Sequence, residues 1–395
     1  MSKRKLTEVC DITTGKLDAN AAVQNGKYPF FTCAPEPLRI DEYAFDNDVI
    51  LLAGNNAQGN FHINRFTGKF NAYQRTYVIT AKEGYDIDYI KYSLELSLKH
   101  LKNQAQGSQT KFLTMQILDD FMIEDISLEE QRKLISSIVA LDKKIRNNKK
   151  IAEKCEQYAS ELYDYWFLQF EYPNTEGKAY KKSGGDLYKN ESNKLQYPAE
   201  WNMGQIGDLG TITAGGTPST TKAEYYCDNG IAWITPNDLS EQTGNMFISH
   251  GERDITELGL KDSSAIIMPA GSVLFSSRAP IGYIAISRNQ VCTNQGFKSI
   301  VPNKGYDKLY VYYTLKKYTN SIVKQGGGTT FKEISGDVLA SVEIPLPPKE
   351  LTITFGKKIQ TIAAKRNNLE LENEKLKLLR DHILPLLLNG QLKIV

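Results

Sequence analysis

The sequence predicts an α+β fold: two mixed, mainly β domains in a pseudo-two-fold repeat, separated by two long antiparallel coiled-coil helices. Three observations support this prediction. Segments of the first half recur in order in the second, short β-type runs fill the front of each half, and an unbroken heptad pattern fills each back. The 395 residues are long enough for more than one domain.

The internal repeat relates segments that keep the same order in both halves. One similar segment could arise by chance, whereas a preserved order along the whole chain indicates a duplicated plan. The matching pairs are residues 6–15 with 206–215, 48–51 with 272–275, Gln74 with Gln295, 84–86 with 305–307, and Tyr92 with Tyr313.

The front of each half is predicted to be mainly β. Residues 77–80 and 281–286 are rich in β-branched and aromatic side chains, and Gly, Pro, Asn and Asp punctuate such runs. A short helix is expected within each front, at residues 87–99 and 308–317. The sequence therefore predicts two compact domains of mixed structure.

The back of each half is predicted to be one long helix. Apolar residues there recur at alternating spacings of four and three, which is typical of a coiled-coil seam. The predicted seam consists of Leu134, Ile138, Leu141, Ile145, Asn148, Ala152 and Leu162 in the first helix, and Phe355, Ile359, Ile362, Leu369, Leu376 and Ile383 in the second. If the helices pair antiparallel, the polar seam residues Asn148, Arg366, Asn373 and Arg380 fix their register. The alternative is that each helix packs only on its own domain.

Local signals mark the ends of these helices. A capping box begins the first at Ser127 and Glu130. Pro385 is expected to kink or end the second, and Asn389–Gly390 closes it. The predicted boundaries are 1–126 for the first domain, 127–170 for the first helix, 171–200 for a linker, 201–346 for the second domain, and 347–395 for the second helix and tail.

Composition excludes several classes of protein. Hydrophobic residues make up 41% and charged residues 24%, which argues against wholesale disorder. The net charge of +2 argues against binding to nucleic acid by bulk charge, although local basic patches remain possible. The most apolar region, residues 266–286, is broken by two prolines and an arginine, so a cytoplasmic protein without a membrane span is expected.

Motifs for catalysis or metal binding are missing from the sequence. There is no phosphate-binding P-loop, no His-Glu-x-x-His and no Gly-x-Ser-x-Gly. The five cysteines are widely spaced without a Cys-x-x-Cys pair, which argues against a zinc site or a disulfide framework. We therefore expect no enzyme, no cofactor and no metal in this chain.

Loops that combine Asn or Gln with basic residues recur in both fronts. Asn and Gln can pair with adenine edges, Arg and Lys with guanine, and Lys with phosphates. The candidates for DNA contact are Asn55, Asn56, Gln58, Lys69, Asn71, Tyr73, Gln74, Arg75, Gln106, Ser108, Gln109 and Lys111 in the first half, and Thr217, Ser219, Lys222, Ser277, Arg278, Asn294, Gln295, Lys298, Lys324, Gln325, Thr329, Thr330 and Lys332 in the second. The alternative is that these loops are ordinary polar turns.

Specific motifs in these loops also carry a family resemblance. They are Gly-Gly-Thr-Pro-Ser at 215–219, Trp-Ile-Thr-Pro-Asn-Asp-Leu at 233–239, Ile-Thr-Glu-Leu-Gly-Leu at 255–260, residues 273–282, Thr-Asn-Gln-Gly-Phe at 293–297, and Ile-Pro-Leu-Pro-Pro at 344–348. With these motifs the chain resembles the specificity subunit of type I restriction–modification systems along nearly its whole length. Residues 68–75 look like another version of the same target-recognition domain, in a half that has Thr14-Gly15-Lys16 in place of the Gly-Gly-Thr-Pro loop.

The resemblance implies a subunit without catalysis of its own. Each target-recognition domain would read one half of a split DNA sequence, which is asymmetric because the loops of the two domains differ. The helices would set the spacer and dock two modification subunits, which bring S-adenosylmethionine, and motor-nuclease restriction subunits would add ATP- and Mg-dependent cleavage. Three alternatives stay open: a modification-only methyltransferase complex, a two-headed coiled-coil scaffold that does not bind DNA, and a nuclease with unrecognised carboxylates.

Overall fold

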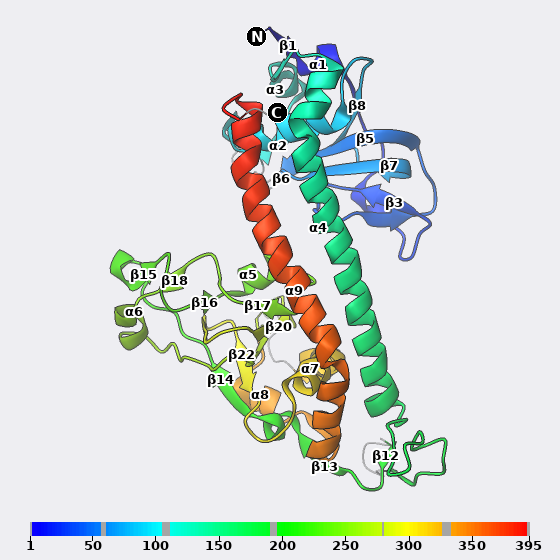
Figure 1. Ribbon diagram of the computed structural model, residues 1–395, viewed down its shortest axis with the longest axis vertical. Coiled ribbons are helices and arrows are strands. Elements are labelled where there is room, and N and C mark those ends of the chain that lie inside the picture. The colour runs from blue at the N-terminus through cyan, green and yellow to red at the C-terminus, as the bar shows by residue number, and fades with distance from the viewer. Residues whose placement is uncertain are drawn as a thin grey trace. The chain divides into compact units, whose positions relative to one another are not determined.

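The computed structural model describes residues 2–56, 61–104, 111–189, 196–278, 280–325 and 333–392, with side chains at 99–104 left aside. The chain divides into two compact units (Figure 1). Unit 1 comprises Met1–Arg146 and Glu374–Val395, and unit 2 comprises Asn147–Asn373. Each long helix therefore contributes one segment to each unit.

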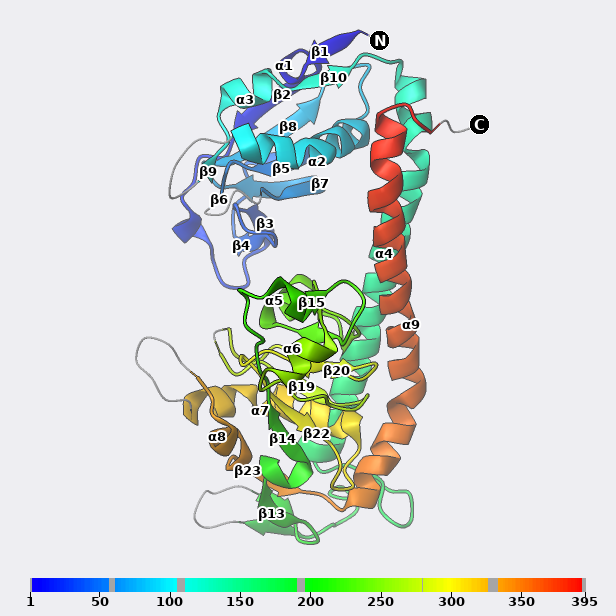
Figure 2. The ribbon, with the colours of Figure 1, turned by 90° about the vertical axis from the view of Figure 1, so that its left-hand side faces the viewer.

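A six-stranded sheet forms the centre of unit 1. Its strand order is β2 (Cys10–Thr14), β8 (Thr76–Ala81), β5 (Phe45–Ala53), β7 (Ile63–Ala72), β3 (Tyr28–Phe31) and β4 (Leu38–Ile40). Neighbours pair antiparallel, except that β3 is parallel to β7. Helix α2 (Ile87–Gln104), which extends beyond the expected end at Lys99, contacts β5, β7 and β8 (Figure 2).

Alternate residues of the central strand β5 pack on opposite faces of this sheet. Ile50 and Leu52 join the cluster that includes Ile90 of α2, whereas Val49 and Leu51 join a second cluster on the other face. This period of two is the natural consequence of strand geometry. Because both faces are buried, the strand reads as a continuous apolar run in the sequence.

The central sheet of unit 2 repeats this plan. Its order is β14 (Thr211–Ala214), β22 (Lys298–Val301), β19 (Val273–Phe275), β20 (Ile284–Ser287) and β17 (Phe247–Ile248), and β17 is parallel to β20 as β3 is to β7. Helix α7 (Lys308–Gln325), longer than the expected 308–317, contacts β19 and β20. The predicted α+β repeat is therefore confirmed at the level of strand order.

Smaller elements complete each unit. β1 (Lys3–Lys5) pairs with β10 (Met122–Glu124), as β13 (Asn202–Gln205) pairs with β23 (Glu343–Leu346). Unit 1 also contains α1 (Leu6–Val9), a 3₁₀ turn (Ala19–Ala21), β6 (Asn55–Asn56), β9 (Lys111–Phe112) and α3 (Met115–Asp119). Unit 2 also contains two 3₁₀ turns (Ile206–Leu209 and Ala223–Tyr225) and the helices α5 (Pro236–Glu241), α6 (Glu257–Lys261) and α8 (Gly336–Ala340). Its additional short strands are β15 (Tyr226–Cys227), β16 (Trp233–Ile234), β18 (Asp254–Ile255) and β21 (Cys292–Thr293). Within residues 171–200, β11 (Leu187–Lys189) pairs with β12 (Gln196–Pro198).

A Gly-Tyr-Asp turn joins each domain to the first turn of its long helix. The Asp86 amide donates to Oε1 of Gln131 at 2.7 Å, and the Asp307 amide donates to Oγ1 of Thr352 at 3.3 Å. The same aspartates cap α2 and α7: Oδ1 of Asp86 accepts from the Asp88 amide at 3.0 Å, and Oδ1 of Asp307 accepts from the Leu309 amide at 2.8 Å. The repeat thus extends to the way in which a short helix meets a long one.

The two long helices are α4 (Leu128–Tyr163), followed by a π-helical turn (Asp164–Leu168), and α9 (Lys349–Leu388). The predicted capping box begins α4, since the Ser127 amide donates to Glu130 and the Glu130 amide donates to Oγ of Ser127. Pro385 does not end α9, which continues to Leu388. Gly390 then closes it with a φ of +69°, a conformation that glycine adopts without strain.

The helices pair antiparallel within each unit. In unit 2, Asn148 bonds Asn373, and further along α4 the ring of Tyr163 lies 5.9 Å from that of Phe355, so residue numbers rise on α4 as they fall on α9. All the predicted seam residues are buried or half-buried. The helices also pack on the domains, because Ile138 and Leu387 belong to the core of unit 1.

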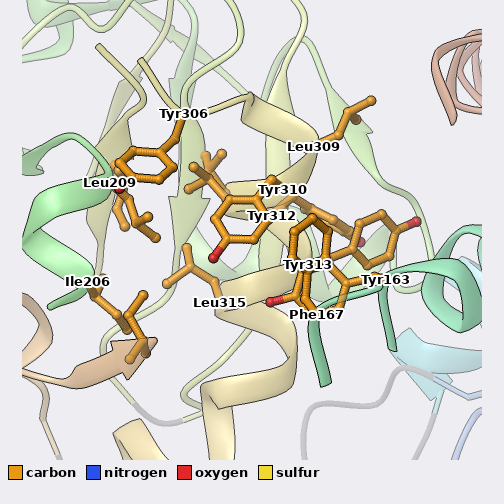
Figure 3. Packing of buried hydrophobic residues seen from close by; sticks show 14 of the residues in the cluster. Tyr163, Phe167, Ile206, Leu209, Tyr306, Leu309, Tyr310, Tyr312, Tyr313 and Leu315 are labelled. Carbon is orange, nitrogen blue, oxygen red and sulfur yellow. The ribbon is translucent and has the colours of Figure 1, made fainter. Parts of the chain in front are cut away.

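Many aromatic side chains pack in the largest hydrophobic cluster of unit 2 (Figure 3). Phe167, just beyond α4, lies 4.8 Å from the Tyr310 ring of α7 and 5.2 Å from the Phe355 ring of α9. Tyr163 shares a hydrogen bond of 3.0 Å with Thr314. The C-terminal end of α4 is therefore part of the hydrophobic core of unit 2.

Candidate nucleic-acid interface

Several sequence candidates of unit 1 meet at one edge of its sheet. The short strands β6 and β9 pair, which places Asn55 opposite Phe112 and Asn56 opposite Lys111. The turn before β8 joins them, because the carbonyl of Arg75 accepts from the Gly54 amide at 2.8 Å. The guanidinium carbon of Arg75 lies 5.2 Å from the Phe112 ring centroid. We call this group, with Gln74, the unit 1 edge.

The unit 1 edge leaves polar groups available. Gln74 and Arg75 are exposed, and Tyr73 is half-buried. Within the described part of the chain, the side chain of Gln74 makes one long contact, of 3.5 Å from its Nε2 to Asp18. Oδ1 of Asn55 is buried and has no hydrogen-bond partner among the described residues. A buried oxygen of this kind is costly unless a ligand or water supplies a donor.

Two other candidates of the first half lie away from this edge. Asn71 is 5% exposed; its Nδ2 donates to the Glu42 carbonyl at 3.2 Å and its Oδ1 accepts from the Ala72 amide at 2.9 Å. The ammonium of Lys69 lies 4.6 Å from the centroid of the Tyr43 ring. The amide of Asn71 thus holds the local backbone.

Unit 2 places candidates at the equivalent position of its sheet. Thr217 donates a hydrogen bond to Oε1 of Gln295, the residue that corresponds to Gln74. The glycine that follows the first strand of each central sheet lies against the backbone of another segment. An added Cβ on Gly15 would lie 1.9 Å from the Ala72 carbonyl oxygen, and one on Gly215 would lie 1.8 Å from the Asn294 carbonyl oxygen. Glycine is therefore required at both sites for the same steric reason. We call the loop 215–219 with Gln295 the unit 2 edge.

Most of the remaining unit 2 candidates that the structure describes are engaged with other protein groups. Ser277 is fully buried, and both its amide and its hydroxyl donate to the Gly296 carbonyl. Nζ of Lys222 donates to the Tyr225 hydroxyl at 2.6 Å, and Arg278 pairs with Glu333 at 3.0 Å. In addition, Oδ1 of Asn294 accepts from the Gly296 amide, and the hydroxyl of Ser219 shares a hydrogen bond with that of Thr221. The other described candidates are Lys298, which is half-buried in β22, and Lys324 and Gln325, which are exposed at the end of α7. The candidates Gln58, Gln106, Ser108, Gln109, Thr329, Thr330 and Lys332 lie outside the described residues.

Sequence reasoning missed three residues at these edges. Phe112 forms the face on which Arg75 lies, and Tyr226 forms a similar face for Arg253, whose guanidinium carbon is 4.4 Å from the ring centroid. Arg253 and Tyr226 come from the part of unit 2 that lies between β14 and β19 and includes β15, β16, α5 and α6. The only available signal was an aromatic residue next to polar loops, which by itself does not identify a stacking partner.

A carboxylate of α4 anchors each domain to the helix pair. In unit 1, Asp142 of α4 accepts from the Tyr92 hydroxyl of α2 at 2.7 Å and from Arg380 of α9 at 3.1 Å. Burial acts to raise the pKa of Asp142, but the bond from Tyr92 and the charges of Lys91 and Arg380 outweigh it and hold the pKa below its ordinary value.

Unit 2 contains an anchor of the same chemistry. Glu156 of α4 accepts from the Tyr313 hydroxyl of α7 at 2.9 Å and pairs with Arg366 of α9. Glu370, 3% exposed, accepts from the backbone amides of Met246 and Phe247 at 2.8 and 3.0 Å. These contacts attach the edge strand β17 and the helix α7 to the long helices.

The described residues contain little that would support catalysis. They include no group of three or more His, Cys, Asp or Glu that could hold a metal ion. Burial raises the pKa of the Cys10 thiol to about 12 and that of Cys292 to about 11, so both thiols are protonated near neutral pH and are poor nucleophiles. Within the same part of the chain, no helix is both long and apolar enough to span a membrane.

Comparisons with known proteins agree with this arrangement. The model of the type I restriction modification DNA specificity domain matches residues 1–157 and 198–380. The chain is 43% identical over 180 residues to the type I restriction enzyme MjaIX specificity subunit of Methanocaldococcus jannaschii, covering 45% of this chain and 40% of that protein. It is 26% identical over 360 residues to the EcoDI specificity subunit of Escherichia coli, covering 87% and 77% of the two chains.

A solved structure shows the same fold. The S subunit of a type I restriction–modification system from M. genitalium superposes with a TM-score of 0.56 at 15% sequence identity. The match covers 98% of this chain and 95% of that one. At this identity the likeness concerns the fold, which agrees with the repeated sheets and paired helices described above.

Proposed function

The chain belongs to the family of type I restriction–modification DNA specificity domains, and from this premise we propose that it is the DNA-recognition subunit of a type I assembly. Membership makes it a recognition component and not an enzyme. In this proposal each domain reads one half of a bipartite duplex sequence. The single observation that carries the proposal is the pair of equivalent sheet edges, each with an exposed glutamine, together with an arginine on an aromatic ring that belongs to the unit 1 edge and one whose ring contacts the unit 2 edge.

The composition of the two edges supports an asymmetric target. The unit 1 edge presents Asn55, Gln74 and Arg75, whereas the unit 2 edge presents Thr217 and Gln295 at the corresponding sheet position. Different donor and acceptor sets select different bases in the major groove. Two unlike edges therefore read two unlike half-sites, while identical edges would read a palindrome.

The long helices are the proposed docking surface for two modification subunits. In unit 2, Ile151 and Tyr158 of α4 and Ile353 of α9 are 43%, 50% and 41% exposed, although they are apolar or aromatic. Ile151 and Tyr158, seven positions apart, lie on one face of α4, and apolar residues grouped on one exposed face are typical of a surface that binds a partner protein. The modification subunits would supply S-adenosylmethionine chemistry, and motor-nuclease restriction subunits would supply ATP- and Mg-dependent cleavage, all in the cytoplasm.

The test is a binding selection from randomised duplex DNA, performed on the full chain with co-expressed modification subunits. Arg75→Ala should relax base preference in one half-site only, and Gln295→Ala should relax it only in the other. Losing one bidentate base contact corresponds to about 5- to 150-fold weaker binding of the cognate base. Methylation mapping in a host that carries the same variants gives an independent readout.

The control is Lys69→Ala, which removes a charge away from the unit 1 edge. It should leave the base preference of both half-sites unchanged and weaken binding slightly and uniformly, as loss of a phosphate contact does. The proposal fails if the wild-type target is a palindrome, or if Arg75→Ala relaxes bases in both half-sites.

A further inference from the structure

Four arginines lie in unit 2, and three of them are ion-paired. Arg278 pairs with Glu333 at 3.0 Å, Arg288 with Glu370 at 3.4 Å, and Arg366 with Glu370 at 2.9 Å. Arg253 is exposed and forms no ion pair with any residue that the structure describes. Among the described arginines of this unit, Arg253 is therefore the one without an ion pair, and its donors face solvent.

The ring beneath Arg253 is held in place by its own contacts. The hydroxyl of Tyr226 donates to the Pro218 carbonyl at 2.7 Å, and its ring meets the buried Trp233 edge-on at 5.8 Å. Trp233 in turn donates from Nε1 to the Gly216 carbonyl at 2.9 Å. A fixed ring restricts the guanidinium stacked on it, which lowers the entropy lost when that group binds.

The location of this stack connects it to the unit 2 edge. Pro218 and Gly216, which accept the bonds from Tyr226 and Trp233, flank Thr217, and Thr217 bonds Gln295. In unit 1, Arg75 lies on Phe112 beside Gln74 at the equivalent edge. Two segments that differ in sequence thus each supply an arginine on an aromatic ring, and in unit 2 the loop 216–218 connects that ring to the glutamine.

We propose that Arg253, stacked on Tyr226, reads a guanine in the half-site bound by unit 2. The inference rests on the proposed function and names a specificity-determining residue that the sequence motifs do not identify. A guanidinium carries its N–H donors in one plane, and Tyr226 holds that of Arg253 from one side. That geometry matches the two acceptors O6 and N7 of guanine, the commonest specific contact of arginine in the major groove.

The experiment compares three variants of the full chain, each with co-expressed modification subunits, in selections from randomised duplex DNA. Arg253→Ala should abolish the preference for guanine at one position and weaken binding of the guanine-containing target by about 5- to 150-fold. That position should lie in the half-site that Arg75→Ala leaves intact. Arg253→Lys, which keeps the charge and loses the planar fork, should also lose most of the preference.

The matched control is Lys261→Ala, which also removes an exposed positive charge, here at the end of the nearby helix α6. It should weaken all sequences alike, with a smaller salt dependence of binding. The inference is overturned if Arg253→Ala behaves like this control, because Arg253 then contacts phosphate. A wild-type complex without any sequence preference would instead overturn the proposed function itself, so the two failures are distinguishable.

Discussion

Polar residues within the helix seam are individually satisfied. Nδ2 of Asn148 donates to Asn373 at 3.0 Å and to Glu372 at 2.7 Å, and Arg366 and Arg380 pair with carboxylates across the helices. Buried ion pairs contribute little net stability compared with apolar packing, but they strongly disfavour other registers, which would leave a charge unpaired. These contacts give a physical basis for the prediction that the four polar residues fix the register of the two long helices.

The anchor at Asp142 makes a testable contribution to stability. Asp142→Asn removes a charge that Arg380 and Tyr92 bond, so we expect a loss of about 1.5–3 kcal/mol in the free energy of unfolding near neutral pH. Because the folded-state pKa of Asp142 is lowered, its contribution is complete above the ordinary value of 3.8 and disappears as the pH falls through the folded pKa. Chemical denaturation of both proteins from pH 7 down to pH 3 measures the difference. A gap that stays constant over this range contradicts the assignment.

Glu370 contributes to pH dependence with the opposite sign. Burial raises its pKa, and Arg366 and the amides of Met246 and Phe247 only partly counteract this. Its contribution is therefore complete below its ordinary value of 4.5 and is lost as the pH rises through the raised pKa. For this reason the comparison at Asp142 must use the difference between wild type and variant, since the total stability mixes both groups.

The long helices are stabilised by what they bury and not by their propensity. Isolated helices gain little without tertiary packing, and here the heptad positions provide it. Apolar residues off the seam are a different case, because Leu378 of α9 is 72% exposed. Position in the heptad, more than residue type, decides what a leucine or isoleucine contributes.

A matched pair of substitutions in unit 1 tests this distinction. Ile138→Ala removes a fully buried side chain at the seam and should lower the free energy of unfolding by about 2–5 kcal/mol. Leu378→Ala removes an exposed side chain and should change it by less than about 0.5 kcal/mol. Denaturant titration of both variants is the measurement. Equal effects would show that the seam does not carry the packing energy.

The two units share one plan, although their loops differ. The order β2-β8-β5-β7-β3 matches β14-β22-β19-β20-β17, including the parallel last pair. Unit 2 adds the small pairs β15–β18 and β16–β21, which include Tyr226 and Trp233. A shared scaffold with different insertions is a means of changing sequence preference without changing the fold.

The proposed role of the helices as a spacer predicts the effect of a paired deletion. Removing residues 146–152 from α4 and 373–379 from α9 keeps the heptad phase and retains both anchors, Asp142–Arg380 and Glu156–Arg366. Each helix becomes shorter by about 10 Å at 1.5 Å per residue. Selection from randomised duplexes should return the same half-sites with a gap shorter by about 3 base pairs, at about 3.4 Å per base pair, or no binding. Removing residues 146–152 alone is the control and should abolish binding, and an unchanged gap in the paired deletion would contradict the spacer role.

How much of the candidate site could be predicted depended on the range of the interactions involved. Gln74, Arg75 and Gln295 were predicted to contact DNA because Asn, Gln and basic residues recur in order in both halves, and the structure places them at equivalent edges. Asn71 and Ser277 have the same composition, yet they are buried and bond the backbone. Burial depends on neighbours distant in sequence, so composition could not separate these two groups.

The sequence by itself determined the duplicated plan, the two long helices, their seam and the capping box at Ser127, because repeats, heptads and caps are local patterns. The tertiary structure decided that α2 and α7 extend beyond their expected ends and that α9 passes Pro385. It also decided which carboxylates anchor each domain, and that Arg253 lies on Tyr226, 27 positions earlier in the chain. These contacts join segments that are far apart in sequence, and only the folded chain brings such segments together.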